Sequence, residues 1–541
     1  MTVPRMVDYH ETCRTFDWNL PETFNFGADV VDRYAREVER PALIWCNAAG
    51  AERRFTFADI KRLSDRFAHG LAEGGVRKGD RVVVMLPRLP EWQVAMVACF
   101  KLGAVAVPCI DMLTGRDLAY RIEHSGARAI VTTEAIRAKV PTDAASLALR
   151  IFLEGDGRWT SDGQEIATSD APFEPARVGL EDPVVIYYTS GTTGNPKGVT
   201  HAARALYVWR YQARYWLDLG DGDLMWCTAD TGWSKAGTSI LFGPWSWGVP
   251  VLFHDGPYEP QKRLELLARY RVTVFCAAAT ELRRLIFEDV GAHDLLALRR
   301  TVSAGETLNP EVASRWTELT GAPTHEGYGQ TESLMSVHNY PCTPGKLGSM
   351  GLPLPGYRVA VLDDNGTRAG TGETGTIAIG LPNPNLFLGY WREPGRQARS
   401  IVRNKEGEWW LTGDSGWMDA DGYVFFEGRG DDIISSAGYR IGPSEVENAL
   451  LEHPAVRECA AVASPDPERG EIVKAFVVLA DGVAGSEDLV RDLQHHCKRT
   501  TAPYKYPREV AFVADLPKNV AGKLLRGVLK RQEYERKGVK P

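Results

Sequence analysis

The sequence has no paired cysteines and no long apolar run. Its nine cysteines are scattered from Cys13 to Cys497, and none forms a C-x-x-C pair. This distribution is typical of reduced, mostly buried thiols and argues against a disulfide framework. The best candidate for a membrane span, residues 94–110, contains Lys101 as well as glycine and proline. A buried helix followed by a strand therefore explains it better.

An N-terminal signal and an excess of positive charge are also lacking. Residues 1–18 contain no apolar core of a signal peptide and are too acidic for a typical transit peptide. With a net charge of −7 and a pI near 6.0, neither nucleic acid nor an anionic membrane is expected as the main partner. We therefore expect a cytoplasmic protein without a membrane span.

What the chain does have is length and apolar content. It has 541 residues, of which 44% are hydrophobic and 25% charged, as in soluble globular proteins with a large core. This length exceeds one ordinary domain. Short β-branched segments alternate with amphipathic ones up to about residue 345, and short strands joined by turns follow.

The predicted fold is α/β. We expect a large N-terminal domain, residues 1–430, made of stacked α/β subdomains and a β-barrel-like subdomain. A small mobile α+β domain, residues 431–541, is expected to follow a hinge near Asp431. In this C-terminal part the pattern predicts helices over 443–452 and 486–499 and strands over 457–463, 471–480 and 509–514.

A glycine-rich loop follows the apolar segment at 184–188, in the stretch YYTSGTTGNPKGVTH. It is not a Walker loop, because Lys197 is followed by Gly198 rather than by Ser or Thr. Pro196 also keeps the preceding residue out of a helix. We expect a hairpin-like flap whose glycines, hydroxyls and lysine can bind phosphate, although an ordinary polar turn fits the loop equally well by itself.

Four further segments have the composition of a nucleotide site. SAGETLNP begins at residue 303, and EGYGQTE spans residues 326–332. Asp414 is predicted to lie in a glycine-flanked turn, where its carboxylate could accept both hydroxyls of a ribose. Lys523 follows a glycine in LPKNVAGKLLR. Each segment met singly is an ordinary surface turn. No G-x-S-x-G motif is present, which argues against a hydrolase.

Together and in this order, these motifs resemble the adenylate-forming superfamily of acyl-CoA synthetases, luciferase-like enzymes and peptide-synthetase adenylation domains. The matching stretches include YYTSGTTGNPKGV, EGYGQTE, LTGDSGW, AGYRIGPSEVE and PKNVAGK, and the resemblance runs from about residue 25 to residue 530. TADTGWSKAG, SAGETLNPEV and APYKYPREVAFV most resemble medium-chain acyl-CoA synthetases. The resemblance implies a ligase that uses ATP, Mg²⁺, coenzyme A and a small carboxylic acid.

The resemblance also implies roles at the ATP site. Thr331 would donate to the α-phosphate and Glu332 would hold Mg²⁺, a hard cation suited to oxygen ligands. Asp414 would bind the ribose, assisted by Arg429. The phosphate flap would comprise Thr189, Ser190, Gly191, Thr192, Thr193, Gly194 and Lys197. Gly305, Glu306 and Thr307 would line the adenine slot, and Tyr328 would lie against the base. The other implied nucleotide contacts are Glu326, Gly327, Gly329, Gln330 and Arg440.

The C-terminal part would act in both half-reactions. Lys523 is the expected catalytic cation of adenylation, because the attack of a carboxylate on a phosphate develops negative charge. A swing about Asp431 would then withdraw Lys523 and bring Gly438 to the coenzyme A tunnel. The residues that the resemblance assigns to coenzyme A are Ala437, Gly438, Tyr439, Arg469, Tyr506 and Arg508.

Residues 225–253, where tryptophans alternate with small residues, are expected to form part of the acyl pocket. Gly232, Trp233 and Gly329 are the expected lining residues, and at least half of the four tryptophans in this segment are expected to be core. No basic residue is evidently required, which fits an apolar acid: a medium-chain or branched fatty acid, with an aryl acid as alternative.

Two other functions stay open at this point. One is an adenylating enzyme that passes its acyl group to a carrier protein or another acceptor. The other is a non-catalytic nucleotide-binding protein, although the presence of Lys523, Glu332 and Asp414 together weighs against it.

Overall fold

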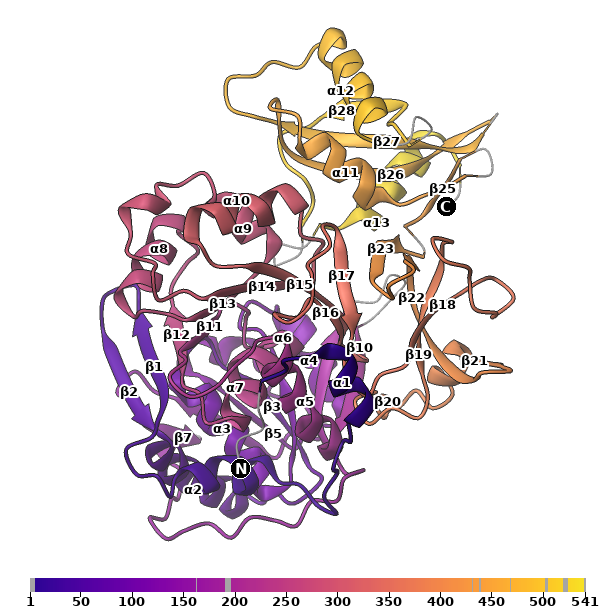
Figure 1. Cartoon of the computed structure of the whole chain (residues 1–541). Helices are drawn as coiled ribbons and strands as arrows, with labels where there is room; N and C mark the ends of the chain where they lie inside the picture. Colours follow the sequence, from indigo (N-terminus) through magenta and orange to yellow (C-terminus); the bar gives the residue numbers. More distant parts are fainter. Residues whose placement is uncertain are drawn as a thin grey trace.

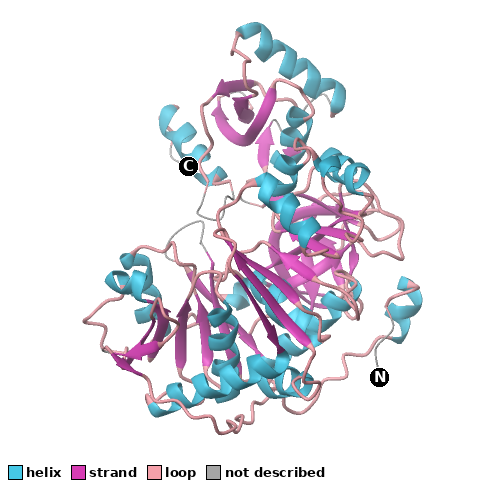
Figure 2. Cartoon of the chain, turned by 90° about the vertical axis from the view of Figure 1, so that its left-hand side faces the viewer, coloured by secondary structure: helices cyan, strands magenta, loops and turns pink. Residues whose placement is uncertain are grey.

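The structure, a computed structural model, contains three β-sheets covered by helices (Figure 1). It describes residues 5–539 except 162, 190–195, 431, 437–438, 468, 502–504 and 519–523. The third sheet and its helices form a smaller C-terminal domain, which lies at the top of both ribbon views (Figure 2). The predicted α/β class is confirmed.

The first sheet has 14 strands and runs through most of the larger part. The pairs from β1 through β12, β11, β13 and β14 to β15 are parallel, and the strands beyond β15 are antiparallel. Its strands in spatial order are β18 (Val359–Leu362), β19 (Gly375–Gly380), β22 (Gly407–Met418), β23 (Val424–Arg429), β17 (Ser349–Pro353), β16 (Leu334–His338), β15 (Thr324–Gln330), β14 (Arg300–Ala304), β13 (Val274–Ala277), β11 (Met225–Cys227), β12 (Val251–Asp255), β1 (Pro41–Asn47) and β2 (Glu52–Thr56), with β21 (Ile401–Asn404) beside β22.

The second sheet has nine strands, with a parallel centre and antiparallel edges. Its strands in spatial order are β20 (Gly389–Tyr390), β10 (Lys197–Ala202), β9 (Pro183–Thr189), β4 (Val105–Pro108), β3 (Arg81–Met85), β5 (Ala129–Thr133), β6 (Leu149–Leu153), β7 (Trp159–Ser161) and β8 (Gln164–Glu165). The third sheet contains β25 (Tyr439–Ile441), β24 (Ile434–Ser436), β27 (Gly470–Leu479) and β26 (Val456–Asp466), with β28 (Glu509–Phe512) beside β27.

The helices begin and end with recognisable signals. Both α2 and α4 begin with a capping box, in which Thr56 pairs with Asp59 and Thr114 with Asp117. The helices are α1 (Tyr9–Thr15), α2 (Phe57–Glu73), α3 (Pro90–Leu102), α4 (Gly115–Ser125), α5 (Ala203–Tyr215), α6 (Ser234–Ala236), α7 (Gly243–Ser246), α8 (Pro260–Arg269), α9 (Ala279–Leu285), α10 (Pro310–Thr320), α11 (Pro443–Leu451), α12 (Glu487–Thr500) and α13 (Arg526–Arg536), with short π or 3₁₀ turns at Gly27–Asp32, Glu134–Lys139, Gly237–Phe242, Val290–Ala292 and Gln397–Ser400.

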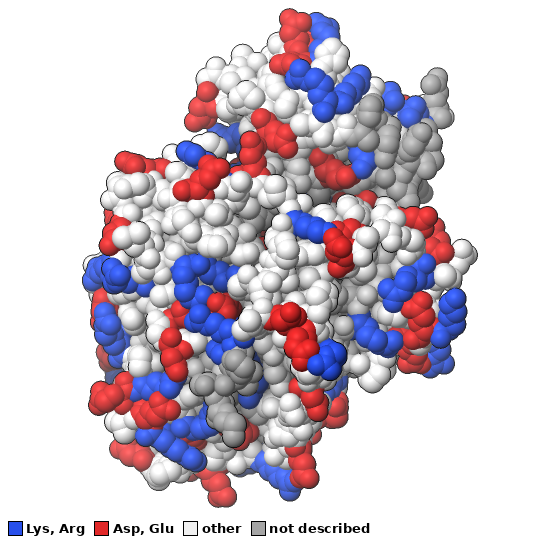
Figure 3. All heavy atoms as spheres, in the orientation of Figure 1, with Lys and Arg blue, Asp and Glu red and all other residues white. Residues whose placement is uncertain are grey.

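The main core joins the first two sheets. Leu43 of β1, Val84 of β3, Val97 of α3 and Trp209 of α5 belong to one cluster of buried side chains. Acidic and basic side chains are mixed over the surface that Figure 3 shows. In the described part of the chain, no helix is long and apolar enough to cross a membrane. All nine cysteines are free, and seven are buried, as the sequence predicts.

Part of the first sheet curls back on itself. Strands β15, β16, β17, β23 and β22 pair in that order. Even so, the Gln330 side chain at the end of β15 donates to the Thr412 carbonyl of β22 at 3.0 Å. A flat sheet would keep strands four places apart well beyond hydrogen-bonding distance, since neighbouring strands are about 4.8 Å apart. This curl is the barrel-like feature that the sequence predicts, and it brings two site motifs together.

The sequence pattern misplaced some elements. The predicted strand at 184–188 and the buried helix and strand within 94–110 are present as β9, α3 and β4. The amphipathic stretch 201–216 predicts a helix, but its first two residues, including His201, lie in β10, which pairs with β9. The C-terminal elements lie within a few residues of their predicted positions, but β24, β25 and α13 were not predicted.

Candidate active site

Three of the predicted site segments follow the carboxyl ends of parallel strands in the first sheet. Residues 228–235 follow β11, residues 305–307 follow β14, and residues 331–332 follow β15. In open α/β sheets, ligands bind in the crevice outside this end of the strands. The segments therefore lie where a ligand is expected from topology alone.

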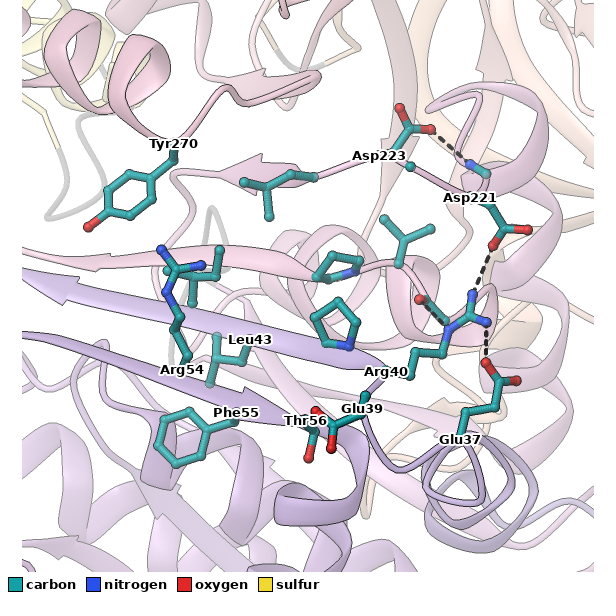
Figure 4. A pocket seen from close by; sticks show the side chains of 18 of the residues that line it. Glu37, Glu39, Arg40, Leu43, Arg54, Phe55, Thr56, Asp221, Asp223 and Tyr270 are labelled. Carbon is teal, nitrogen blue, oxygen red and sulfur yellow. Dashed lines mark hydrogen bonds and ion pairs between the residues drawn. The ribbon is translucent and has the colours of Figure 1, made fainter.

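A separate hollow of about 1060 Å³ lies at the opposite, amino ends of β1, β11 and β12 (Figure 4). Pro41, Leu43 and Pro250 contribute apolar surface to it. The Arg40 guanidinium at its rim pairs with Glu37 at 2.7 Å and with Asp221 at 2.9 Å. Since the charged rim is already paired and no predicted site residue lines this hollow, we do not assign it to the ATP site.

The expected adenine segment is anchored by the carboxyl group of the half-buried Glu326. The Leu308 backbone N–H donates to Glu326 Oε1 of β15 at 3.1 Å. Burial raises the pKa of Glu326 to about 8, so this group is mostly protonated at neutral pH. Gly305 has φ +92°, a conformation that side chains rarely adopt. Glu306 accepts from the Thr280 hydroxyl at 3.3 Å, and Thr307 is half-buried.

Asp414 is held by three side chains from two motifs. The Tyr328 hydroxyl donates to Asp414 Oδ2 at 2.6 Å, and the Gln330 amide donates to the same oxygen. Arg429 pairs with Oδ1 at 3.1 Å. The carboxylate is only 3% exposed. The structure thus joins EGYGQTE with the aspartate and the arginine that the resemblance assigns to ribose.

The local structure at Asp414 differs from the sequence prediction. Asp414 lies within β22, directly opposite Arg429 of β23, and not in a turn. An irregularity in the pairing follows at Ser415–Gly416. Gly329 in β15 also has a packing role, because a Cβ atom there would lie 1.9 Å from the Leu334 carbonyl oxygen. Gly327 is buried beside it.

Thr331 and Glu332 lie where the two large sheets meet. The Thr331 hydroxyl is 3.4 Å from Ser234 Oγ. The Thr331 carbonyl accepts from His201 Nε2 of β10 at 2.7 Å. Burial lowers the pKa of His201 to about 4, so its ring is neutral and Nε2 carries the proton. Glu332 Oε1 accepts from the Tyr390 hydroxyl of β20 at 2.9 Å.

The expected phosphate flap joins β9 and β10. Thr189 ends β9 and pairs with Lys197 at the start of β10, so the two strands form an antiparallel hairpin. Burial lowers the pKa of Lys197, and the nearby Arg396 lowers it further. The predicted flap residues Ser190, Gly191, Thr192, Thr193 and Gly194 lie outside the described residues.

The expected acyl segment packs between the sheets. Trp226 and Trp245 are 1% and 0% exposed, so half of its tryptophans are core, as predicted. Trp233 is half-buried and packs on the edge of a core cluster. Gly232 lies against the Cys109–Ile110 backbone. The segment also carries a half-buried cation, Lys235, whose ammonium donates to the Ala304 carbonyl at 3.1 Å.

The C-terminal domain contains the residues expected to bind coenzyme A. The Arg508 guanidinium lies 5.0 Å from the centre of the Tyr506 ring, so these two side chains are in cation–π contact. Arg469 precedes β27 and donates to Ser436 at 3.3 Å. Tyr439 and Arg440 belong to β25. Asp431, Ala437, Gly438 and Lys523 lie outside the described residues.

Two residues that touch the site were not predicted as members of it. His201 stands at the end of the glycine-rich stretch, and Tyr390 lies almost 200 residues further along the chain. Neither lies in a pattern that marks a catalytic group. Their contacts depend on how β10 and β20 pair, which only the tertiary structure reveals.

The fold and the grouped motifs define an adenylate-forming enzyme. The model of the AMP-binding enzyme family matches residues 31–391, and that of the AMP-binding enzyme C-terminal domain matches residues 445–523. The chain therefore belongs to the AMP-binding enzyme family. This confirms the superfamily that the motifs indicate.

Relatives of known identity match nearly the whole chain. The chain is 40% identical to acyl-coenzyme A synthetase ACSM3, mitochondrial, of Mus musculus, covering 98% of this chain and 94% of the relative. An acyl-CoA synthetase of Brucella canis has 34% identity and a TM-score of 0.75, covering 98% and 100%. The anthranilate CoA ligase AuaEII, in complex with anthranoyl-AMP, has 28% identity and a TM-score of 0.86, covering 97% and 100%.

Proposed function

We propose that this AMP-forming carboxylate–CoA ligase activates a medium-chain or branched fatty acid, with an aryl acid as the alternative. ATP and the acid give acyl-AMP and pyrophosphate, and coenzyme A then takes the acyl group. The observation that carries this proposal is the grouping of Asp414, Tyr328 and Gln330 beside the Thr331–Glu332 pair. Relatives named as acyl-CoA synthetases and CoA ligases support it.

In the first half-reaction, the described residues bind and orient ATP. Asp414 accepts the ribose hydroxyls, and Arg429, which pairs with its carboxylate, assists. Glu326 fixes the adenine segment through the Leu308 N–H. The Thr331 hydroxyl donates to the α-phosphate, where charge develops.

Glu332 fits the role of a magnesium ligand. Its carboxylate accepts one hydrogen bond, from Tyr390, and it forms no ion pair with any residue that the structure describes. An oxygen is therefore available for a hard cation. The described residues include no group of three or more potential ligands, so phosphate oxygens would complete the coordination. Bound Mg²⁺ would neutralise phosphate charge during the displacement.

A domain rotation would separate the two half-reactions. We place the domain boundary between residues 430 and 431 and the hinge at Asp431. Lys523 would act in adenylation only, and Arg469, Tyr506 and Arg508 would meet coenzyme A afterwards, since arginine forks match phosphate oxygens.

The deciding experiment is acid-dependent ATP–pyrophosphate exchange over a panel of straight-chain, branched and aryl acids. Thioester formation with coenzyme A or with a carrier protein is then measured. We expect exchange with a subset of acids and a coenzyme A thioester. Exchange with no acid would contradict catalysis, and exchange without a coenzyme A thioester would favour the carrier-protein reading.

Lys523→Ala tests the rotation. It should abolish adenylation and spare thioester formation from supplied acyl-AMP. An equal loss in both steps would contradict the two-conformation account.

A cytoplasmic location remains a proposal supported by the free cysteines. The relative named as mitochondrial points to the other compartment, and cell fractionation decides between them.

A further inference from the structure

Tyr390 joins the Glu332 carboxylate to the strand that ends the phosphate flap. Its hydroxyl donates to Glu332 Oε1 at 2.9 Å. Its backbone belongs to β20, in which Tyr390 lies opposite Val199 and Gly389 lies opposite Thr200 of β10 (Figure 1). One side chain thus reaches from the second sheet to the end of β15 in the first.

The backbone around Tyr390 is tied to the same two places. The Phe387 N–H donates to the Glu332 carbonyl at 2.9 Å. The Leu388 N–H donates to Thr200 of β10 at 2.8 Å, and the Trp391 N–H donates to Gly198 at 2.7 Å. Residues 387–391 therefore form a short bridge between β10 and Glu332, with the Tyr390 side chain as its polar contact.

The Tyr390 ring also contacts the positive charge of the flap. Lys197 Nζ lies 5.6 Å from the ring centre, and the Arg396 guanidinium lies 5.4 Å from it. Cations within about 6 Å of an aromatic ring are attracted to its face. The same side chain therefore touches the expected metal carboxylate and the expected phosphate lysine.

We propose that Tyr390 is a positioning residue for the metal–phosphate end of the ATP site. Its hydroxyl fixes the Glu332 carboxylate so that the free oxygen faces Mg²⁺, and its ring orients Lys197 toward the same phosphates. This inference rests on the proposed function and deepens it. The alternative is a packing role, since the ring also contacts Phe387 at 5.0 Å.

Tyr390→Phe separates the two roles, because it removes the hydroxyl and keeps the ring. The measurement is the dissociation constant of α,β-methylene-ATP by calorimetry, with and without Mg²⁺. Outer partners of metal ligands change metal affinity by about 10- to 100-fold when mutated. In the wild type, Mg²⁺ should lower the dissociation constant of the analogue, and we expect this gain to be about tenfold smaller in the variant. The dissociation constant measured without Mg²⁺ should be unchanged.

The matched control is Tyr423→Phe, whose hydroxyl donates to the Pro344 carbonyl away from the site at 2.6 Å. It should leave both dissociation constants unchanged. In exchange kinetics, Tyr390→Phe should raise the half-saturating Mg²⁺ concentration and leave the KM of the acid unchanged.

Equal weakening with and without Mg²⁺ would show that Tyr390 only packs, and unchanged binding in both conditions would overturn the proposal outright. A wild type that does not bind the nucleotide analogue would overturn the proposed function itself, and this inference with it.

Discussion

Asp414 and Glu332 are two carboxylates of one candidate site that differ in burial and in their hydrogen-bond partners. Asp414 is buried and meets Tyr328, Gln330 and Arg429. Glu332 is half-buried, and among the described residues its carboxylate accepts one hydrogen bond, from Tyr390. The Asp414 carboxylate is therefore held in place without a ligand, whereas the Glu332 carboxylate still has an oxygen that can bind a cation.

Because of this difference, a mutation can lower the stability of the fold at one position and the rate of the reaction at the other. Removing a buried acceptor leaves its donors unsatisfied, which costs about 1–3 kcal/mol for each group. Removing a carboxylate that has one partner among the described residues should cost little stability, but under the proposed function it removes charge that the transition state needs. Mutations at the two positions should therefore affect different measurements.

Glu332→Gln should have the largest effect on activity. The amide can still accept from Tyr390, so we expect the free energy of unfolding to change by less than about 0.5 kcal/mol. Adenylation should fall about 10²- to 10³-fold, because the metal loses its anionic ligand. Pyrophosphate exchange and urea unfolding measure the two. Glu318→Gln, at an exposed pair with Arg315, is the control. A large loss of stability would erase the contrast with Asp414.

Asp414→Ala should lower both stability and ATP affinity. Tyr328 and Gln330 lose their shared acceptor, so we expect a loss of about 2 kcal/mol in the free energy of unfolding. The KM for ATP should rise about tenfold or more, while thioester formation from supplied acyl-AMP is less affected. Urea unfolding together with exchange kinetics tests this. An unchanged unfolding curve would mean that the three contacts contribute nothing.

Glu326 extends the comparison to a third carboxyl group, which keeps its proton. Its pKa is about 8 in the native state and about 4.5 when unfolded, so between these values the native state binds more protons. Stability should then fall as pH rises through this window. Glu326→Gln keeps an acceptor for Leu308 and removes the ionisation. We expect the variant to gain at least about 1 kcal/mol over wild type at pH 8 and almost nothing at pH 4.5, by urea unfolding. A gain independent of pH would contradict this.

Trp233→Ala should have the smallest effect, and this effect should be confined to the preference among acid substrates. If Trp233 lines the acyl pocket, its removal enlarges the pocket and shifts preference toward longer acids by a few-fold in kcat/KM. Exchange with straight-chain and aryl acids measures this shift. Unchanged preference across the series would remove Trp233 from the pocket, while Asp414 and Glu332 would keep their roles.

The sequence predicts which motif residues lie together, but not the elements and side chains around them. The ordered motifs identify Glu332 and Asp414 without a structure, because their composition and order are distinctive. The strand at Asp414 was missed because its flanking glycines are also typical of turns. Tyr390 could not be predicted, since its contact depends on the pairing of β20 with β10. Helix α13 was missed because its sequence, RGVLKRQEYER, offers few apolar positions.

The continuous series of paired strands from β14 to β22 has a consequence for the rates of nucleotide entry and release. Glu326 and Asp414 lie on strands of one hydrogen-bonded sheet, closed by side-chain contacts between β15 and β22. Spreading these walls apart would break several backbone hydrogen bonds at once. If this is the ATP site, we expect ATP to enter and AMP to leave without the opening of these strands, and we expect movement of the smaller C-terminal domain to control both rates.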